Sequence, residues 1–167
     1  MIRAALLLVV LASSTALAAD VPSQTKDFAD KATVANKFEI DTSQLALKYG
    51  KGEDVKKFAQ QMIDDHTKAG EEFKAAVKEA GIEPPSDTLD MSHQATYAKL
   101  RLFTTEAGFD ASYISAQLNA HKDAVALFRD YAANGPTPQL KAFAEKTLPT
   151  LEHHLSMVED LSRKYTQ

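Results

Sequence analysis

The sequence of 167 residues contains no cysteine and no tryptophan. Without cysteine, the chain cannot form a disulfide, bind a metal through thiolates or carry a lipid on a cysteine at a cleavage site. Without tryptophan, a stacking platform for sugars is disfavoured. The formal net charge is −4, and the lysines are scattered rather than gathered in a basic patch. This charge distribution argues against binding to nucleic acid and to anionic membrane surfaces.

Long hydrophobic runs are also absent, apart from one short run near the start of the chain. Residues 4–12 are apolar and follow Arg3. They lead to Ala16-Leu17-Ala18, in which two small residues flank one position, as at a cleavage site. This pattern predicts a secretory signal peptide over residues 1–18, cleaved after Ala18 or Ala19. A transmembrane helix would need about 18 or more apolar residues. We therefore expect an exported bacterial protein of the periplasm, with residues 19–167 forming one domain and no membrane span after cleavage.

Signals for β-strands are nearly absent, whereas apolar residues recur at spacings of three and four along most of the chain. Glycine and proline interrupt this pattern, as at Gly50 and at Gly135 with Pro136. The resulting predicted helices cover residues 25–49, 53–80, 91–103, 110–133 and 138–165. The four long helices predict an all-α four-helix bundle. Two hairpins joined by a long crossover, which carries the short extra helix, would give the ferritin-like arrangement.

Four ionisable residues interrupt the apolar stripes of the long helices, one on each helix. They are Glu39, His66, His121 and His154. Ionisable side chains are normally kept out of a helical core unless they are paired or bind a ligand. Each lies within about three positions of its helix centre, or roughly 5 Å at the rise of an α-helix. Because a helix centre has the same height whether the helix runs up or down, these side chains are expected to meet in one layer.

Three imidazoles and a carboxylate in one layer predict a site for a transition metal such as zinc, copper, nickel or iron. Asp65, beside His66, and Gln117, one turn before His121, are the expected outer partners of the ligands. The di-iron centres of ferritin-like oxidases need a glutamate three positions before each histidine. Those positions here hold the apolar residues Ile63, Leu118 and Leu151. A carboxylate-bridged di-iron centre is therefore disfavoured.

The chain also resembles a known bacterial family through several stretches spread over most of its length. These stretches are Phe38-Glu39-Ile40 with Ser43 and residues 45–47, residues 55–59 with 62–66, Phe109-Asp110 with Tyr113, Gln117 and His121, and residues 140–144 with Leu148, Pro149, Leu151 and His154. The family is the ferritin-like domain of unknown function 4142, whose members are often labelled outer-membrane proteins. The resemblance implies a secreted helical bundle of the cell envelope and brings no established reaction with it.

Three interpretations of the polar layer follow from the sequence. The first is a non-enzymatic protein that binds one transition metal through Glu39, His66, His121 and His154. The second is a non-catalytic interaction module of the envelope or of a stress response, in which the same residues form a metal-free, hydrogen-bonded core. The third is an enzyme that uses the site, which would need a channel to solvent. The leucines and phenylalanines of the stripes argue against a channel. A homo-oligomer is compatible with each interpretation.

Overall fold

The computed structural model describes residues 20–103 and 108–165, and its regular structure within these ranges is entirely helical. The helices are α1 (Ser23–Tyr49), α2 (Glu53–Glu79), α3 (Met91–Leu102), α4 (Phe109–Asn134) and α5 (Pro138–Tyr165). The all-α bundle predicted from the sequence is therefore confirmed. The predicted signal peptide lies outside the described residues. Among the helices of residues 20–103 and 108–165, none is both long enough and apolar enough to span a membrane.

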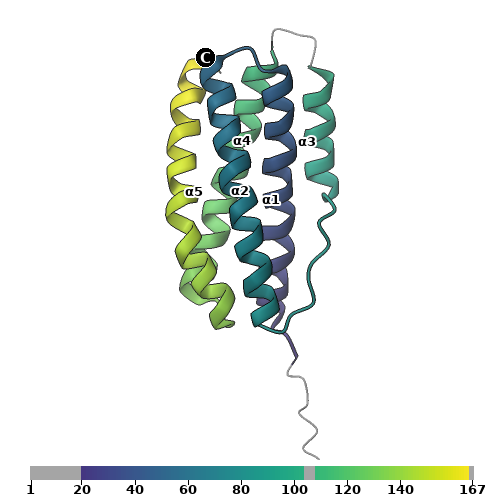
Figure 1. Ribbon diagram of the computed structural model, residues 1–167, viewed down its shortest axis with the longest axis vertical. Helices are drawn as coiled ribbons and strands as arrows, with labels where there is room; N and C mark the ends of the chain where they lie inside the picture. Colours follow the sequence, from purple (N-terminus) through teal and green to yellow (C-terminus); the bar gives the residue numbers. More distant parts are fainter. Residues whose placement is uncertain (1–19, 104–107, 166–167) are drawn as a thin grey trace, which may run out of the picture.

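The four long helices pack side by side as two antiparallel hairpins, α1 with α2 and α4 with α5 (Figure 1). Helix α2 also packs against α5, and α1 packs against α4, so the four helices enclose a common core. The crossover after α2 runs up the outer side of the bundle and includes α3, which packs against α1 and α4. Only short turns join the helices within each hairpin, which explains their antiparallel pairing.

The core consists of two apolar clusters with a polar layer between them. The lower core, near the start of α1 in Figure 1, comprises Phe28, Ala29, Ala32, Phe73, Val77, Ala124, Val125, Phe128, Tyr131, Leu140, Phe143, Ala144 and Leu151. The upper core comprises Ala46, Val55, Phe58, Ala59, Met62, Leu100, Phe109, Tyr113, Ile114 and Val158. The polar layer contains buried Glu39, Thr42, Ser43, His66, Gln117, His121 and His154.

The turn between α1 and α2 is held by Asp110, at the start of α4. The backbone N–H of Gly52 donates to Asp110 Oδ2 at 2.7 Å, and that of Lys51 donates to the same carboxylate, 3.0 Å from Oδ1. The side chain of Asp110 is almost entirely buried, so these donors replace water around the carboxylate. The contact therefore fastens the first hairpin to the second at the upper end of the bundle.

Replacing this carboxylate should destabilise the protein. We expect Asp110→Ala to lower the free energy of unfolding by about 2–3 kcal/mol, because two backbone donors lose their charged, buried acceptor. Urea unfolding followed by circular dichroism measures the change. Asp123→Ala, on the exposed face of the same helix, is the matched control and should change stability by less than about 0.5 kcal/mol. Equal losses in both variants would contradict this account of the turn.

Candidate metal centre

Three histidines from three helices converge in the polar layer. His66 of α2, His121 of α4 and His154 of α5 are 7%, 0% and 1% exposed. Their ring centroids form a nearly equilateral triangle with sides of 5.8, 5.6 and 5.5 Å. One ring nitrogen from each histidine lies within 4.8 Å of the other two. The structure therefore brings together three of the four ligands predicted from the sequence.

Two of these imidazoles are oriented by acceptors on the outer side of the cluster. His154 Nε2 lies 2.9 Å from Asp65 Oδ2, and His121 Nδ1 lies 3.0 Å from the backbone oxygen of Gln117. A carboxylate and a carbonyl only accept hydrogen bonds, so both ring nitrogens must be the donors. A neutral imidazole carries one N–H. The other nitrogen of each ring, Nδ1 of His154 and Nε2 of His121, therefore has a free lone pair.

The third imidazole follows the same pattern with a partner that sequence reasoning missed. His66 Nδ1 lies 3.1 Å from Asn36 Oδ1, which leaves His66 Nε2 as the nitrogen with a lone pair. Asn36 is half-buried on α1, beside the apolar stripe rather than in it. Gly70 makes room for it, because a Cβ at residue 70 would lie 2.9 Å from Asn36 Nδ2. The only sequence signal for this contact is the small residue four positions after His66.

Burial keeps His66 and His154 neutral. It lowers the pKa of His66 well below its usual value of 6.5, and the neighbouring His121 and His154 lower it further. Burial also lowers the pKa of His154 to about 4, although its hydrogen bond to Asp65 acts in the opposite direction. At neutral pH both rings therefore present unprotonated nitrogens, the form in which imidazole binds a metal.

Glu39, the fourth predicted ligand, lies beside the cluster on the outward side of His121. Its Oε1 is 3.6 Å from His121 Nδ1, the nitrogen that also faces the Gln117 carbonyl. Burial raises the pKa of Glu39, while His121 and Gln117 act to lower it. The carboxyl group is thus placed to interact with His121 at Nδ1, the nitrogen that donates to the Gln117 carbonyl.

Gln117 takes part in the layer through two different groups. Its backbone oxygen accepts from His121, whereas its side-chain Nε2 donates to Thr42 Oγ1 at 3.0 Å. The sequence placed Gln117 near His121 because the two are one helical turn apart. It could not show that the backbone, rather than the side chain, would hold the imidazole.

The polar layer concentrates buried atoms that lack hydrogen-bond partners within the described residues. These atoms are Glu39 Oε2, His66 Nε2, Gln117 Oε1, His121 Nε2 and His154 Nδ1. A buried polar atom without a partner costs about 1–3 kcal/mol, so folded proteins contain few of them. Three of the five are the ring nitrogens that the outer hydrogen bonds leave with lone pairs. These three nitrogens therefore offer their lone pairs to a ligand that accepts electron pairs, such as a metal ion.

A cavity of about 430 Å³ adjoins the three histidines and extends into the lower core. The apolar stripes had suggested a filled interior without such a channel, and that expectation was wrong. The small side chains Ala32, Ala124 and Gly70 leave space between the aromatic rings that the stripes also contain. The pattern of a single helix cannot reveal such a space, because the space depends on which large and small side chains of different helices face each other.

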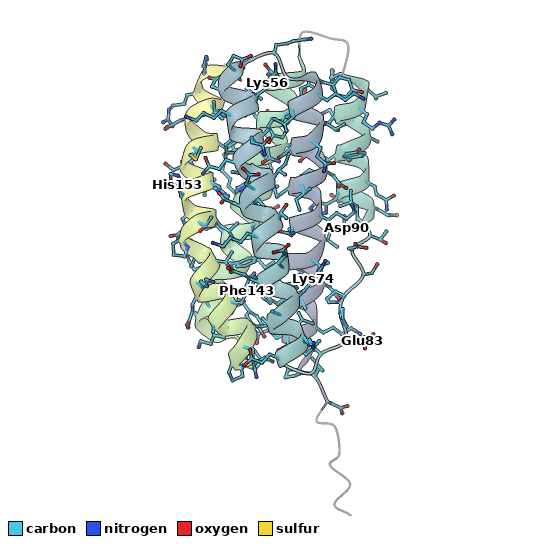
Figure 2. All side chains as sticks on the ribbon, viewed as in Figure 1. Lys56, Lys74, Glu83, Asp90, Phe143 and His153 are labelled. Carbon is cyan, nitrogen blue, oxygen red and sulfur yellow. The ribbon has the colours of Figure 1, made fainter. Side chains whose placement is uncertain are left out.

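The two remaining histidines lie outside the cluster. His153 is exposed on the outer side of α5 (Figure 2). His93 is 30% exposed in its side chain, and its Nδ1 pairs with Asp90 Oδ1 at 2.8 Å. Its ring packs edge-to-face on Phe38 with centroids 4.8 Å apart, so α3 is fastened to α1 by this contact.

The fold and the site define a helical-bundle protein with a buried three-histidine cluster. Residues 10–161 match the family described as Domain of unknown function (DUF4142), and the chain belongs to this family. A search of curated proteins finds no match.

Two solved structures share the fold. "CopM in the Cu(II)-bound form" has a TM-score of 0.70 and 18% sequence identity, over 85% of this chain and 96% of that chain. "CopM in the Cu(I)-bound form" has a TM-score of 0.67 and 17% identity, over 84% of this chain and 96% of that chain. At these identities the likeness concerns the fold.

Proposed function

We propose that this protein binds one transition-metal ion through His66 Nε2, His121 Nε2 and His154 Nδ1. The observation that carries the proposal is the arrangement of these three buried atoms. Each is without a hydrogen-bond partner in the described part of the chain, and each belongs to a ring whose other nitrogen donates outward. Metal-binding histidines are typically oriented in this way by an acceptor on the far side of the ring.

The distances require only a small contraction. Ligand nitrogens 2.0–2.1 Å from a metal lie roughly 3.4 Å apart in tetrahedral geometry. One ring nitrogen from each of the three histidines lies within 4.8 Å of the other two. A displacement of each ring by about 1 Å toward the common centre closes the difference.

Copper is the metal that we favour. Imidazole nitrogen suits copper, zinc, nickel and iron, and Cu(II) binds most tightly among the divalent ions of this series. The two CopM structures that share the fold are described as copper-bound. Asp65, Asn36 and the Gln117 carbonyl would hold the ligand rings in place. Glu39 would supply negative charge next to His121 without coordinating the ion directly.

The role that fits this site is binding of the metal in the periplasm rather than catalysis. The signal-peptide pattern of residues 1–18 supports export. Within the described layer, the side-chain nitrogen of Gln117 is already engaged, because it donates to Thr42. We therefore propose a non-enzymatic protein that holds a metal ion inside its bundle.

Metal stoichiometry tests the proposal directly. Purified protein loaded with Cu(II) and dialysed should retain about one equivalent, measured by elemental mass spectrometry. His154→Ala should lose the bound metal, because it removes one of three ligands. His153→Ala is the matched control, since it removes an exposed imidazole from the adjacent position. It should retain the full equivalent.

Three results would contradict the proposal. If His154→Ala retains the metal, the ion lies elsewhere on the chain. Equal loss of metal in His154→Ala and His153→Ala would likewise contradict the proposed site. Absence of bound metal in the unmodified protein, tested with copper, zinc, nickel and iron, would instead favour the metal-free interaction module.

A further inference from the structure

The cavity extends from the histidine cluster mainly toward the lower end of the bundle. On each long helix its lining residues begin at the polar layer and continue toward the lower end of the bundle. They run from Asp41 back to Ala32 on α1, from Asp65 to Val77 on α2, from His121 to Phe128 on α4, and from His154 back to Phe143 on α5. The 11 positions from His66 to Val77 correspond to about 16 Å of helix. A metal ion and its bound water would fill only the upper end of this space.

The inner wall of the cavity is aromatic. Phe73 and Phe143 have ring centroids 5.1 Å apart, and Phe128 and Phe143 have centroids 5.9 Å apart. Phe143 lies in the lower half of the bundle, well below His153, the neighbour of His154 (Figure 2). Ala32 and Leu151 complete this part of the lining with apolar surface. Cavities of this size with aromatic walls and a few convergent polar atoms are typical of sites for small organic ligands.

The outer part of the cavity carries more negative than positive charge. The charged side chains there are Asp41, Asp65, Glu71, Asp87, Lys37 and Lys74. Lys37 is already paired with Asp41 at 3.0 Å. The excess of carboxylates favours the entry of cations and neutral molecules over that of anions.

We propose that the cavity binds a neutral, flat organic base. A donor atom of this ligand takes the open coordination position on the metal, and its apolar body lies against Phe73, Phe128 and Phe143. The inference rests on the proposed metal site, because three protein ligands leave a fourth position open. It goes beyond that site by assigning the chemical class of a second ligand and the surface that recognises it.

The probes for this proposal are imidazole and 4-phenylimidazole, which share a donor and differ in the apolar ring. Protein loaded with one equivalent of Co(II) reports coordination through its visible absorption bands. Both probes should shift these bands. 4-Phenylimidazole should bind about 10- to 100-fold more tightly, because its phenyl ring is buried in the aromatic part of the cavity. Equal affinities of the two probes would overturn the proposal.

Variants that fill the cavity provide the second arm. Ala32→Leu and Thr147→Leu place bulk on its wall without touching a histidine, and Thr147 is half-buried, so its variant disturbs the core least. Both should remove the advantage of 4-phenylimidazole and leave imidazole binding unchanged. Ala76→Leu, which packs against the lower core but does not line the cavity, is the matched control. An advantage that survives in the two filled variants would also overturn the proposal.

The metal measurement separates the two levels of inference. If cobalt binds but the two probes bind it with equal affinity, the proposed metal site stands and the proposed organic ligand is ruled out. If neither cobalt nor copper binds, both the proposed function and the proposed organic ligand are wrong.

Discussion

Addition of Cu(II) to the metal-free protein should raise its free energy of unfolding by about 4 kcal/mol when free metal exceeds the dissociation constant a thousandfold. The reason is that His66, His121 and His154 come from three different helices and converge only in the folded bundle. An ion that binds only the folded state stabilises it by mass action. For a domain of this size, the midpoint of thermal unfolding should rise by roughly 10 °C.

Thermal unfolding at several concentrations of free metal measures this effect. His121→Ala should abolish the metal-dependent shift, whatever its own effect on the stability of the metal-free protein. His153→Ala should retain the shift. Zn(II) and Ni(II) should give smaller shifts than Cu(II), in the usual order of affinity of these ions for nitrogen ligands. A shift of the same size in His121→Ala would show that the ion acts at the surface and not in the bundle.

The fold could be predicted from the sequence because its signals are local and agree with each other. Apolar residues at spacings of three and four define the buried face of each helix, and Gly50 and Gly135 mark helix ends. Short turns then require antiparallel pairs, and the long segment after α2 requires a crossover. The predicted helix boundaries accordingly differ from those of the structure by at most two residues.

The approach of the three histidines could be predicted for a related reason. Position on the buried face fixes the direction of a side chain, and distance from the helix centre fixes its height. Neither quantity determines which ring nitrogen faces inward, since that depends on acceptors from other elements. Asn36 lies beside the buried stripe, and the Gln117 carbonyl has no sequence signal at all. The position of Glu39 beside the outward nitrogen of His121 depends on the same side-chain detail.

The polar layer also explains why the core is divided. A continuous apolar core would be more stable than one interrupted by five buried atoms without partners. In the described residues these atoms all fall in one layer, between the lower core and the upper core. Their concentration at one height, rather than their number, is what a binding site requires. Bound metal would satisfy three of the five at once.

The metal-free protein should lose stability when the pH falls from about 6.5 to about 4. In the unfolded chain His154 binds a proton near its usual pKa of 6.5, whereas burial lowers the pKa of His154 in the folded protein to about 4. Between these values the unfolded state holds more protons, so stability decreases as the pH decreases. By pH 4.5 this histidine alone should reduce the free energy of unfolding by about 2.5 kcal/mol. His66 acts in the same direction, because burial lowers the pKa of His66 as well.

Urea unfolding of metal-free protein at pH 7.5 and pH 4.5 measures the loss, and a variant isolates the contribution of His154. His154→Gln removes the titrating ring but keeps an amide that can donate to Asp65. The loss between the two pH values should therefore be smaller in this variant by about the amount assigned to His154. His153→Gln removes an exposed imidazole and should lose as much stability as the unmodified protein. Equal losses in all three proteins would mean that His154 takes up its proton over the same pH range in the folded and the unfolded protein, which would contradict the lowered pKa of His154 in the bundle.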